Sequence, residues 1–301
     1  MSEGRAEQVV LVTGGSGRLG RSVVDRLRES YGRVVSIDVA GRADLDNDDR
    51  FPVDLLDAGA CYAAFARYQP DVLVHLAAIA EPFSQPEQTI VKTNITLAYN
   101  VLQAAVDLRV GQIVVAGSPT VMGYDRRTWS PDYLPLDEGH PVAPGHGYSI
   151  SKHLTEEIVR SFVRQVGDRT RFAIFRPSFV VAPEEWQGSP IQGGGTIEER
   201  LDDPEAAGSN LFSYVDARDA AWLVELLLEK INEIPNGDTY FCAAPDALSR
   251  EPIGELLPGL HPGVSADTAS VLVDTSPGIA SAKAMALGWR PVHTWRAELR
   301  S

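Results

Sequence analysis

The chain has 301 residues, of which 44% are hydrophobic, so it can bury the core of one large domain or somewhat more. Its formal net charge of −14 argues against nucleic acid or an anionic membrane surface as a partner. The polar N-terminus lacks the apolar core of a signal peptide, and no apolar run is long enough to span a bilayer. Cys61 and Cys242 are the only cysteines, and the histidines show no metal-ligand spacing. We therefore expect a cytoplasmic protein with no disulfide framework and no metal site.

The chain opens with a pattern typical of a strand, a glycine turn and a helix. Val9–Thr13 are all apolar or β-branched, as in a strand that is buried on both faces, and the residues after Gly20 have helical spacing. Between them stand Gly14, Gly17 and Gly20. Without a Cβ, a turn can fold tightly and its backbone N–H groups can approach a ligand, while the helix N-terminus favours a pyrophosphate. The alternative is an ordinary tight turn. The strand before and the helix after favour a dinucleotide site.

Strands and helices alternate through the first part of the chain. We expect strands at 34–37, 51–54, 71–76, 112–116 and 172–175, and helices at 58–68, 87–108 and 148–166. Such alternation predicts an α/β fold of the Rossmann type, a doubly wound parallel sheet with helices on both faces. Ligands bind beyond the carboxyl ends of such strands. Asp38, Asp54, Ala77, Ala78 and Ser118 all fall at those ends.

The chain after Pro177 is less regular. Residues 177–210 are rich in glycine and proline and are interpreted as loops. We expect helices at 216–230, 252–257 and 276–287, and a strand at 239–242 that joins the main sheet. The expected division is an NAD-binding Rossmann domain at 1–176, to which parts of 211–242 return, and a small, interleaved C-terminal substrate-binding region, mainly 177–301.

Two carboxylates suggest how a dinucleotide is recognised. Asp38 stands 18 residues after Gly20, where it can accept hydrogen bonds from an adenosine ribose and repel a 2′-phosphate, which favours NAD over NADP. Arg42 argues the other way, because a nearby arginine can bind a 2′-phosphate. Asp38 can also be a simple turn residue. Asp54 either meets the adenine amino group or caps the helix that follows.

Tyr148 and Lys152 suggest the chemistry. They are four residues apart in an expected helix, so their side chains share a face. A free tyrosine has a pKa of about 10, and a cation one turn away, together with nicotinamide charge, lowers it. The tyrosinate can then take a hydroxyl proton while hydride leaves to the nicotinamide. Ser118, after the strand at 112–116, can hold the same substrate oxygen. The pair alone would be read as a surface pair, but the glycine turn favours catalysis.

An ordered set of motifs over nearly the whole chain resembles the extended short-chain dehydrogenase/reductases, within the NAD-dependent epimerase/dehydratase superfamily. In chain order, the segments that carry the resemblance are TGGSGRLG (13–20), LVHLAA (73–78), TNITLAYNVLQAA (93–105), AGSPTVMGY (116–124), YSISK (148–152), FRP (175–177), YVDARDAA (214–221) and LGWRP (287–291). The first resembles the family's TGGxGxxG fingerprint and the fifth its Tyr-x-x-x-Lys. Together they are far more specific than any single motif.

The resemblance implies a function for several residues. Ser118, Tyr148 and Lys152 would be the catalytic triad. The residues that would bind or support NAD are Gly14, Gly17, Arg18, Leu19, Gly20, Asp38, Asp54, Leu55, Leu76, Ala77, Ala78, Asn94, Tyr148, Lys152 and Pro177, with Asn94 ordering the active-site helix. In many relatives the helices that correspond to 87–108 and 148–166 pair across a dimer interface, so a homodimer is also expected.

The chain departs from the family at positions that bind nucleotide sugars. Phe179 replaces an asparagine that meets the substrate phosphate, and Asn210 and Leu211 stand where an arginine usually clamps a diphosphate. Met122 replaces the family's common aromatic residue after the serine strand. These changes favour a smaller sugar, sugar acid or polyol over a nucleotide sugar. Arg176, Arg200 and Arg218 can each bind an anionic substrate or form a structural ion pair.

Three functions follow from these patterns. The first is an oxidoreductase that moves hydride between NAD and a hydroxyl or keto carbon of a small sugar-like substrate. The second is a sugar epimerase or dehydratase of the same superfamily that retains its NAD. The third is a catalytically silent NAD-sensing protein, which the intact set of Ser118, Tyr148 and Lys152 disfavours.

Overall fold

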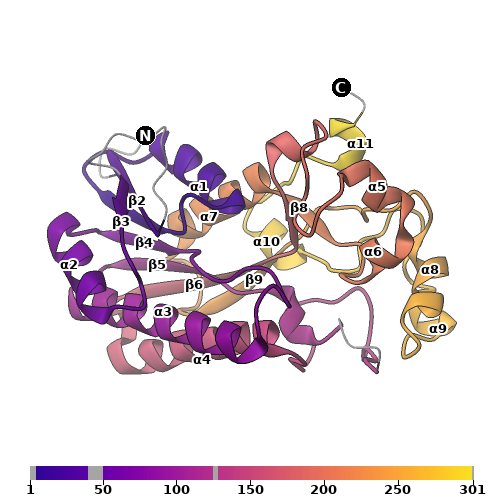
Figure 1. Ribbon diagram of the computed structural model, residues 1–301, viewed down its shortest axis with the longest axis horizontal. Coiled ribbons are helices and arrows are strands. Elements are labelled where there is room, and N and C mark those ends of the chain that lie inside the picture. The colour runs from indigo at the N-terminus through magenta and orange to yellow at the C-terminus, as the bar shows by residue number, and fades with distance from the viewer. Residues whose placement is uncertain (1–4, 40–49, 125–127, 300–301) are drawn as a thin grey trace.

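A seven-stranded parallel sheet lies at the centre of the computed structural model, which describes residues 5–39, 50–124 and 128–299 (Figure 1). The strand order is β3-β2-β1-β4-β5-β6-β9, and every neighbouring pair is parallel. The strands are β1 (Val9–Thr13), β2 (Arg33–Asp38), β3 (Arg50–Pro52), β4 (Val72–His75), β5 (Gln112–Ala116), β6 (Arg171–Pro177) and β9 (Asp238–Cys242). This confirms the expected doubly wound α/β fold. The order reverses between β1 and β4, where such sheets form their ligand crevice.

Helices cover both faces of the sheet (Figure 1). One face packs against α1 (Arg18–Arg28) and α7 (Ala217–Lys230), and the other against α2 (Ala58–Tyr68), α3 (Glu87–Asp107) and α4 (Gly147–Val166). The central strands are buried on both faces, as their unbroken apolar runs require. The sheet therefore holds the ends of its strands rigidly beside the start of each following helix.

The last strand of the sheet comes from the C-terminal part of the chain. β9 pairs with β6 from Ala173 opposite Asp238 to Pro177 opposite Cys242, so the strand expected at 239–242 does join the main sheet. The helix that precedes it, α7, packs beside α1. The proposed division of the chain after residue 176 stays a prediction.

The C-terminal region is more ordered than expected. The interpretation of residues 177–210 as loops is wrong in part, because this segment contains β7 (Phe179–Val181), the 3-10 turn η3 (Pro183–Glu185), α5 (Ile197–Asp202) and α6 (Pro204–Gly208). β7 forms a parallel two-stranded sheet with β8 (Tyr214–Asp216). Each of these elements is too short to show a sequence period.

Short helices complete this region. They are α8 (Ile253–Leu260), α9 (Ala266–Ala269), α10 (Ala282–Ala286) and α11 (Trp295–Glu298). α8 runs beyond the expected end at residue 257. The helix expected at 276–287 is wrong in its first half, since only α10 is helical there. Two further 3-10 turns, η1 (Pro119–Met122) and η2 (Gly167–Arg169), lie next to β5 and α4.

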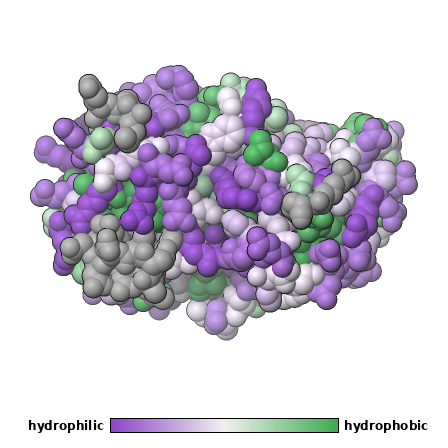
Figure 2. Space-filling view, turned by 90° about the horizontal axis from the view of Figure 1, so that it is seen from above, coloured by the Kyte–Doolittle hydropathy of each residue, from purple (hydrophilic) through white to green (hydrophobic). Residues whose placement is uncertain are grey.

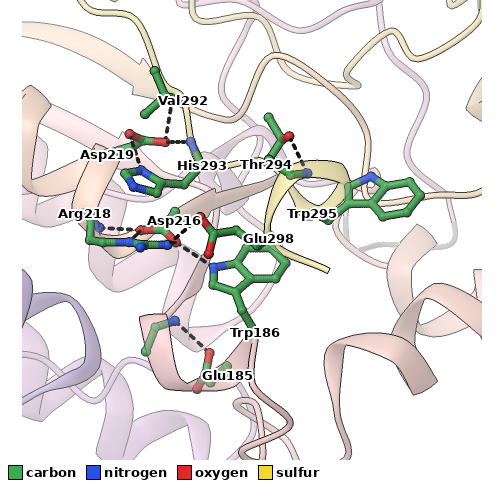
Figure 3. Close-up of polar contacts among 12 residues, drawn as sticks. Glu185, Trp186, Asp216, Arg218, Asp219, Val292, His293, Thr294, Trp295 and Glu298 are labelled. Carbon is green, nitrogen blue, oxygen red and sulfur yellow. Dashed lines mark hydrogen bonds and ion pairs between the residues drawn. The ribbon is translucent and has the colours of Figure 1, made fainter. Parts of the chain in front are cut away.

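Carboxylates at the start of α7 fasten the C-terminal segment (Figure 3). Asp216 caps the helix, accepting from Arg218 N at 2.7 Å, and also binds the Arg218 guanidinium. Asp219 accepts from the backbone N–H groups of Val292 and His293 at 3.0 and 2.8 Å, and its other oxygen lies 2.9 Å from His293 Nδ1. Burial raises the pKa of Asp219, and its bonds with His293 oppose that rise.

The surface seen in Figure 2 is mostly hydrophilic, with separate hydrophobic areas. Among the residues that the structure describes, no helix combines the length and the apolar character needed to cross a membrane.

Candidate active site

A cleft of about 750 Å³ opens at the carboxyl ends of the strands. Most of the residues predicted for the site line this one cleft, although they come from distant parts of the sequence. They are Gly14, Gly17, Arg18, Leu19, Gly20, Asp38, Asp54, Leu55, Leu76, Ala77, Ala78, Ser118, Tyr148, Lys152 and Pro177. Asn94 is the exception and lies behind the cleft wall.

The glycine turn has the geometry that a dinucleotide needs. Gly14 has φ +72°, and a Cβ there would lie 2.8 Å from the backbone nitrogen of Ala77. A Cβ on Gly20 would lie 2.0 Å from the Gly14 carbonyl oxygen, so α1 packs directly on the turn. Gly17 is the N-cap of α1 and adds no capping side chain. The turn thus leaves backbone N–H groups at the cleft, and the residues present fit a bound pyrophosphate.

Two polar residues that do not line the cleft hold the backbone of residues that do. The side chain of Asn94, on α3, bonds both the N–H and the C=O of Ile79, at 2.7 and 3.1 Å, and donates to Ser151 Oγ on α4 at 3.0 Å. It therefore ties the loop after β4 to α4. Thr13, which the sequence analysis missed, accepts through Oγ1 from the N–H groups of Leu76 and Ala77. The one sequence feature that could have indicated this role is its place, as a small polar residue at the end of the first strand.

Asp38 ends β2 and Asp54 follows β3. In the strand order, β1 and β4 separate these two strands from β5, beside which Ser118 and Tyr148 lie. The Asp38 carboxylate accepts from Ser16 N, in the glycine turn, at 3.3 Å and from Val39 N at 2.7 Å. Asp54 accepts from Leu56 N at 3.0 Å. The alternative that Asp54 caps α2 is wrong, because Asp57 is the N-cap. Arg42, the residue that argued for NADP, lies outside the described residues.

Ser118, Tyr148 and Lys152 meet where β5 ends and α4 begins. Ser118 is the N-cap of η1, where its Oγ accepts from Thr120 N at 3.3 Å, and it also shares a hydrogen bond with Tyr148. Lys152 Nζ donates to the Ala116 carbonyl oxygen at 2.9 Å and lies 6.0 Å from the Tyr148 ring centroid. All three side chains are buried. The arrangement can place a hydroxyl, a phenol and an ammonium against one substrate.

The pKa of Tyr148 differs from the expectation. We expected the cation one turn away to lower it, but burial raises the pKa of Tyr148 to about 12, and only the hydrogen bond with Ser118 opposes the rise. Burial also lowers the pKa of Lys152 to about 8, against the attraction of Glu156. Desolvation disfavours the charged form of both groups and is the largest cause of both shifts.

The arginines considered for an anionic substrate divide into two groups. Arg176 is buried and forms a two-bond ion pair with Glu156, at 2.8 and 2.7 Å. Arg218 is held by Asp216 and Glu298 (Figure 3). Neither lines the cleft, so both are structural ion pairs. Arg200, by contrast, does line it.

The cleft continues past Ser118 and Tyr148 into a part that the sequence analysis did not foresee. Its lining includes Glu81, Phe83, Thr120, Tyr124, Ser178 and Gln192. Phe179 and Asn210, which were noted only as departures from the family pattern, line it too. These residues come from loops and short elements without a periodic pattern, so no sequence signal marked them.

Comparisons with known proteins agree with this geometry. Human UDP-glucose 4-epimerase is 29% identical over 227 residues, which cover 68% of this chain and 60% of the human protein. An Escherichia coli dTDP-glucose 4,6-dehydratase is 28% identical over 185 residues, or 52% of this chain and 51% of that protein. The chain thus matches only half to three-fifths of the length of these curated relatives.

A solved structure and a family model extend the match. The crystal structure of a UDP-galactose 4-epimerase is 25% identical, covers 97% of this chain and 96% of its own, and has a TM-score of 0.68. The model of the "NAD dependent epimerase/dehydratase family" matches residues 10–243. NAD is the cofactor that this family uses, as predicted. With its glycine turn, its parallel sheet and this match over most of its length, the chain belongs to the NAD dependent epimerase/dehydratase family.

Proposed function

We propose that the protein is an NAD-dependent oxidoreductase that interconverts a hydroxyl and a keto group on a small sugar-like substrate. The observation that carries the proposal is that Ser118, Tyr148 and Lys152 line the same cleft as the glycine turn. A silent NAD-sensing protein would have no use for these three groups. The residues predicted to contact NAD keep that role in the proposal, with Asn94 as a support.

The chain's own residues would act as follows. Ser118 Oγ holds the substrate oxygen, and Tyr148 exchanges the proton of that oxygen. Bound NAD would supply the acceptor for the hydride of the carbinol carbon, and NADH the donor in the reverse direction. In the direction of reduction Tyr148 acts as an acid, and its raised pKa keeps the O–H proton in place until the substrate oxygen takes it. In the direction of oxidation it acts as the base, and a positive charge on Lys152 favours the tyrosinate.

An epimerase or dehydratase that retains NAD is the second candidate, favoured by the names of the relatives. A panel of sugars and sugar acids, incubated with NAD or NADP, separates the candidates. Net formation of NADH, read by absorbance, supports the dehydrogenase. Isomeric or dehydrated products without net NADH support the second candidate. Bound NAD with no product from any substrate would favour the sensor.

We expect NAD to bind more tightly than NADP. The Asp38 carboxylate would face the 2′ position, and a like charge placed opposite another costs several kcal/mol, so NADP should bind about a hundredfold more weakly or worse. Calorimetry with the two dinucleotides measures the difference in affinity. The Asp38→Asn variant should show a smaller difference between NAD and NADP. Equal or tighter binding of NADP would contradict the assignment and point to Arg42.

We expect UDP to stabilise the protein little. Phe179 and Asn210 line the cleft where relatives place an asparagine and an arginine for the phosphates, so two anchoring groups are missing. A thermal-shift titration with UDP in the presence of NAD checks this. A shift of the melting temperature that saturates at micromolar UDP would overturn the preference for a smaller substrate.

We further propose that the protein acts in the cytoplasm as a homodimer that pairs α3 and α4 of two copies. Tyr99 on α3 and Ile150 and Leu154 on α4 support this proposal, because they are large apolar or aromatic side chains that stay exposed.

A further inference from the structure

Arg200 stands apart from the other cations of the cleft. Arg18 also has a buried Nε without a hydrogen bond, but its guanidinium pairs with Glu185, and Lys152 donates to the Ala116 carbonyl oxygen. Among the described residues, the guanidinium of Arg200 has no acidic partner within ion-pair distance and donates no hydrogen bond, and its Nε is buried. A buried donor without a partner costs free energy, so a ligand that accepts from it would remove that cost.

The guanidinium of Arg200 is held in place by its surroundings. Arg200 lies on α5. Thr196 caps this helix, and the side chains of Ile197 and Leu201 anchor it because they are buried. The Cζ of Arg200 stands 4.5 Å from the ring centroid of Phe179 on β7, a cation–π contact. Burial lowers the pKa of Arg200 to about 10, with the charge of Asp203 opposing, so the side chain stays positive at neutral pH. A stacked guanidinium keeps its edge available for a planar anion.

Two more polar atoms in the same cleft lack partners. Ser178 Oγ and Asn210 Oδ1 are buried without a hydrogen bond, and both residues line the cleft together with Arg200. A hydroxyl can donate or accept, and an amide oxygen accepts from a hydroxyl of a ligand. The three residues therefore offer one positive charge and two groups suited to hydroxyls within the same cleft.

We propose that Arg200 binds a single carboxylate of the substrate, while Ser178 and Asn210 bind its neighbouring hydroxyls. The substrate class is then a sugar acid or similar polyhydroxy acid that carries one negative charge. This inference rests on the proposed function. A diphosphate fits less well, because the other two cations of the described lining are already engaged and Glu81 adds a negative charge.

Binding without turnover tests the inference. In the Tyr148→Phe background, saturated with NAD, calorimetry would follow glucuronate, galacturonate and gluconate, with glucose and galactose as neutral partners and UDP as the dianionic probe. Adding Arg200→Met should weaken binding of the sugar acid about 10- to 100-fold, the worth of a hydrogen bond to a charged group, and leave any neutral sugar unaffected. Arg200→Lys should fall between, since it keeps the charge but loses the planar fork.

The control is Arg250→Met, which removes an exposed arginine paired with Asp202 outside the cleft and should change nothing. NAD affinity and melting temperature check that each variant is folded. Sugar-acid binding that survives Arg200→Met, binding of neutral sugars alone, or binding of UDP that depends on Arg200 would each overturn the inference. If wild-type protein turns over none of the acids that it binds through Arg200, the proposed function fails while this ligand assignment stands.

Discussion

Replacing Tyr148 with phenylalanine is expected to lower turnover by about 10²- to 10⁴-fold, the usual loss when a positioned acid or base is removed. The ring and its packing remain, so only the hydroxyl that we propose exchanges the substrate proton is lost. The affinity for NAD should survive, because the glycine turn and Asp38 are untouched. Steady-state kinetics on a confirmed substrate and calorimetry with NAD give the two readouts.

Tyr62→Phe is the matched control for this variant. Tyr62 lies on α2, outside the cleft, and its hydroxyl bonds Asp107, so loss of that hydroxyl should not change turnover. Near-normal turnover in Tyr148→Phe would make the catalytic assignment wrong. The next candidate base would be His146, whose ring stacks on that of Tyr148 with 6.2 Å between centroids.

Replacing Glu156 with alanine is expected to lower the free energy of unfolding by about 3–5 kcal/mol, the cost of breaking a buried ion pair. The Glu156 side chain is fully buried and accepts two hydrogen bonds from Arg176, which is itself only 3% exposed. Without the carboxylate, a guanidinium stays buried with no counter-charge. Urea unfolding, followed by circular dichroism, measures the change.

Glu157→Ala serves as the control from the same helix. Glu157 is exposed and, among the described residues, forms an ion pair only with Arg160, so its loss should cost less than about 1 kcal/mol. Equal urea midpoints for the two variants would mean that the buried ion pair adds no more to the free energy of unfolding than an exposed pair does. Glu156→Gln keeps the volume and one acceptor and should fall between them.

The sheet and its main helices could be predicted because their signals are long and regular. Residues 9–12 and 113–116 are unbroken apolar runs, and the helices at 87–107 and 147–166 repeat apolar residues over many turns. The proposed catalytic set could be suggested for a different reason, since Tyr148 and Lys152 keep a fixed spacing within one helix.

The substrate end of the cleft could not be predicted in this way. Arg200 lies on a six-residue helix, and Phe179 on a three-residue strand, both too short to leave a period. The expectation of a lowered Tyr148 pKa was wrong for a physical reason. A sequence shows the neighbouring charge of Lys152, but it does not show the burial that raises this pKa.

The pairing of β9 with β6 also bears on how the chain folds. β9 begins at Asp238 and β6 ends at Pro177, so the outer strand reaches the sheet only after a long excursion through the C-terminal region. A fragment ending near residue 176 would leave β6 as a bare edge of unpaired backbone donors and acceptors, open to other chains. It would also leave the face of α1 that packs on α7 without its cover. Residues up to 176 are therefore continuous in sequence but do not complete their own sheet. Closing the sheet depends on contacts made late along the chain, and such contacts slow folding and leave early fragments prone to aggregation.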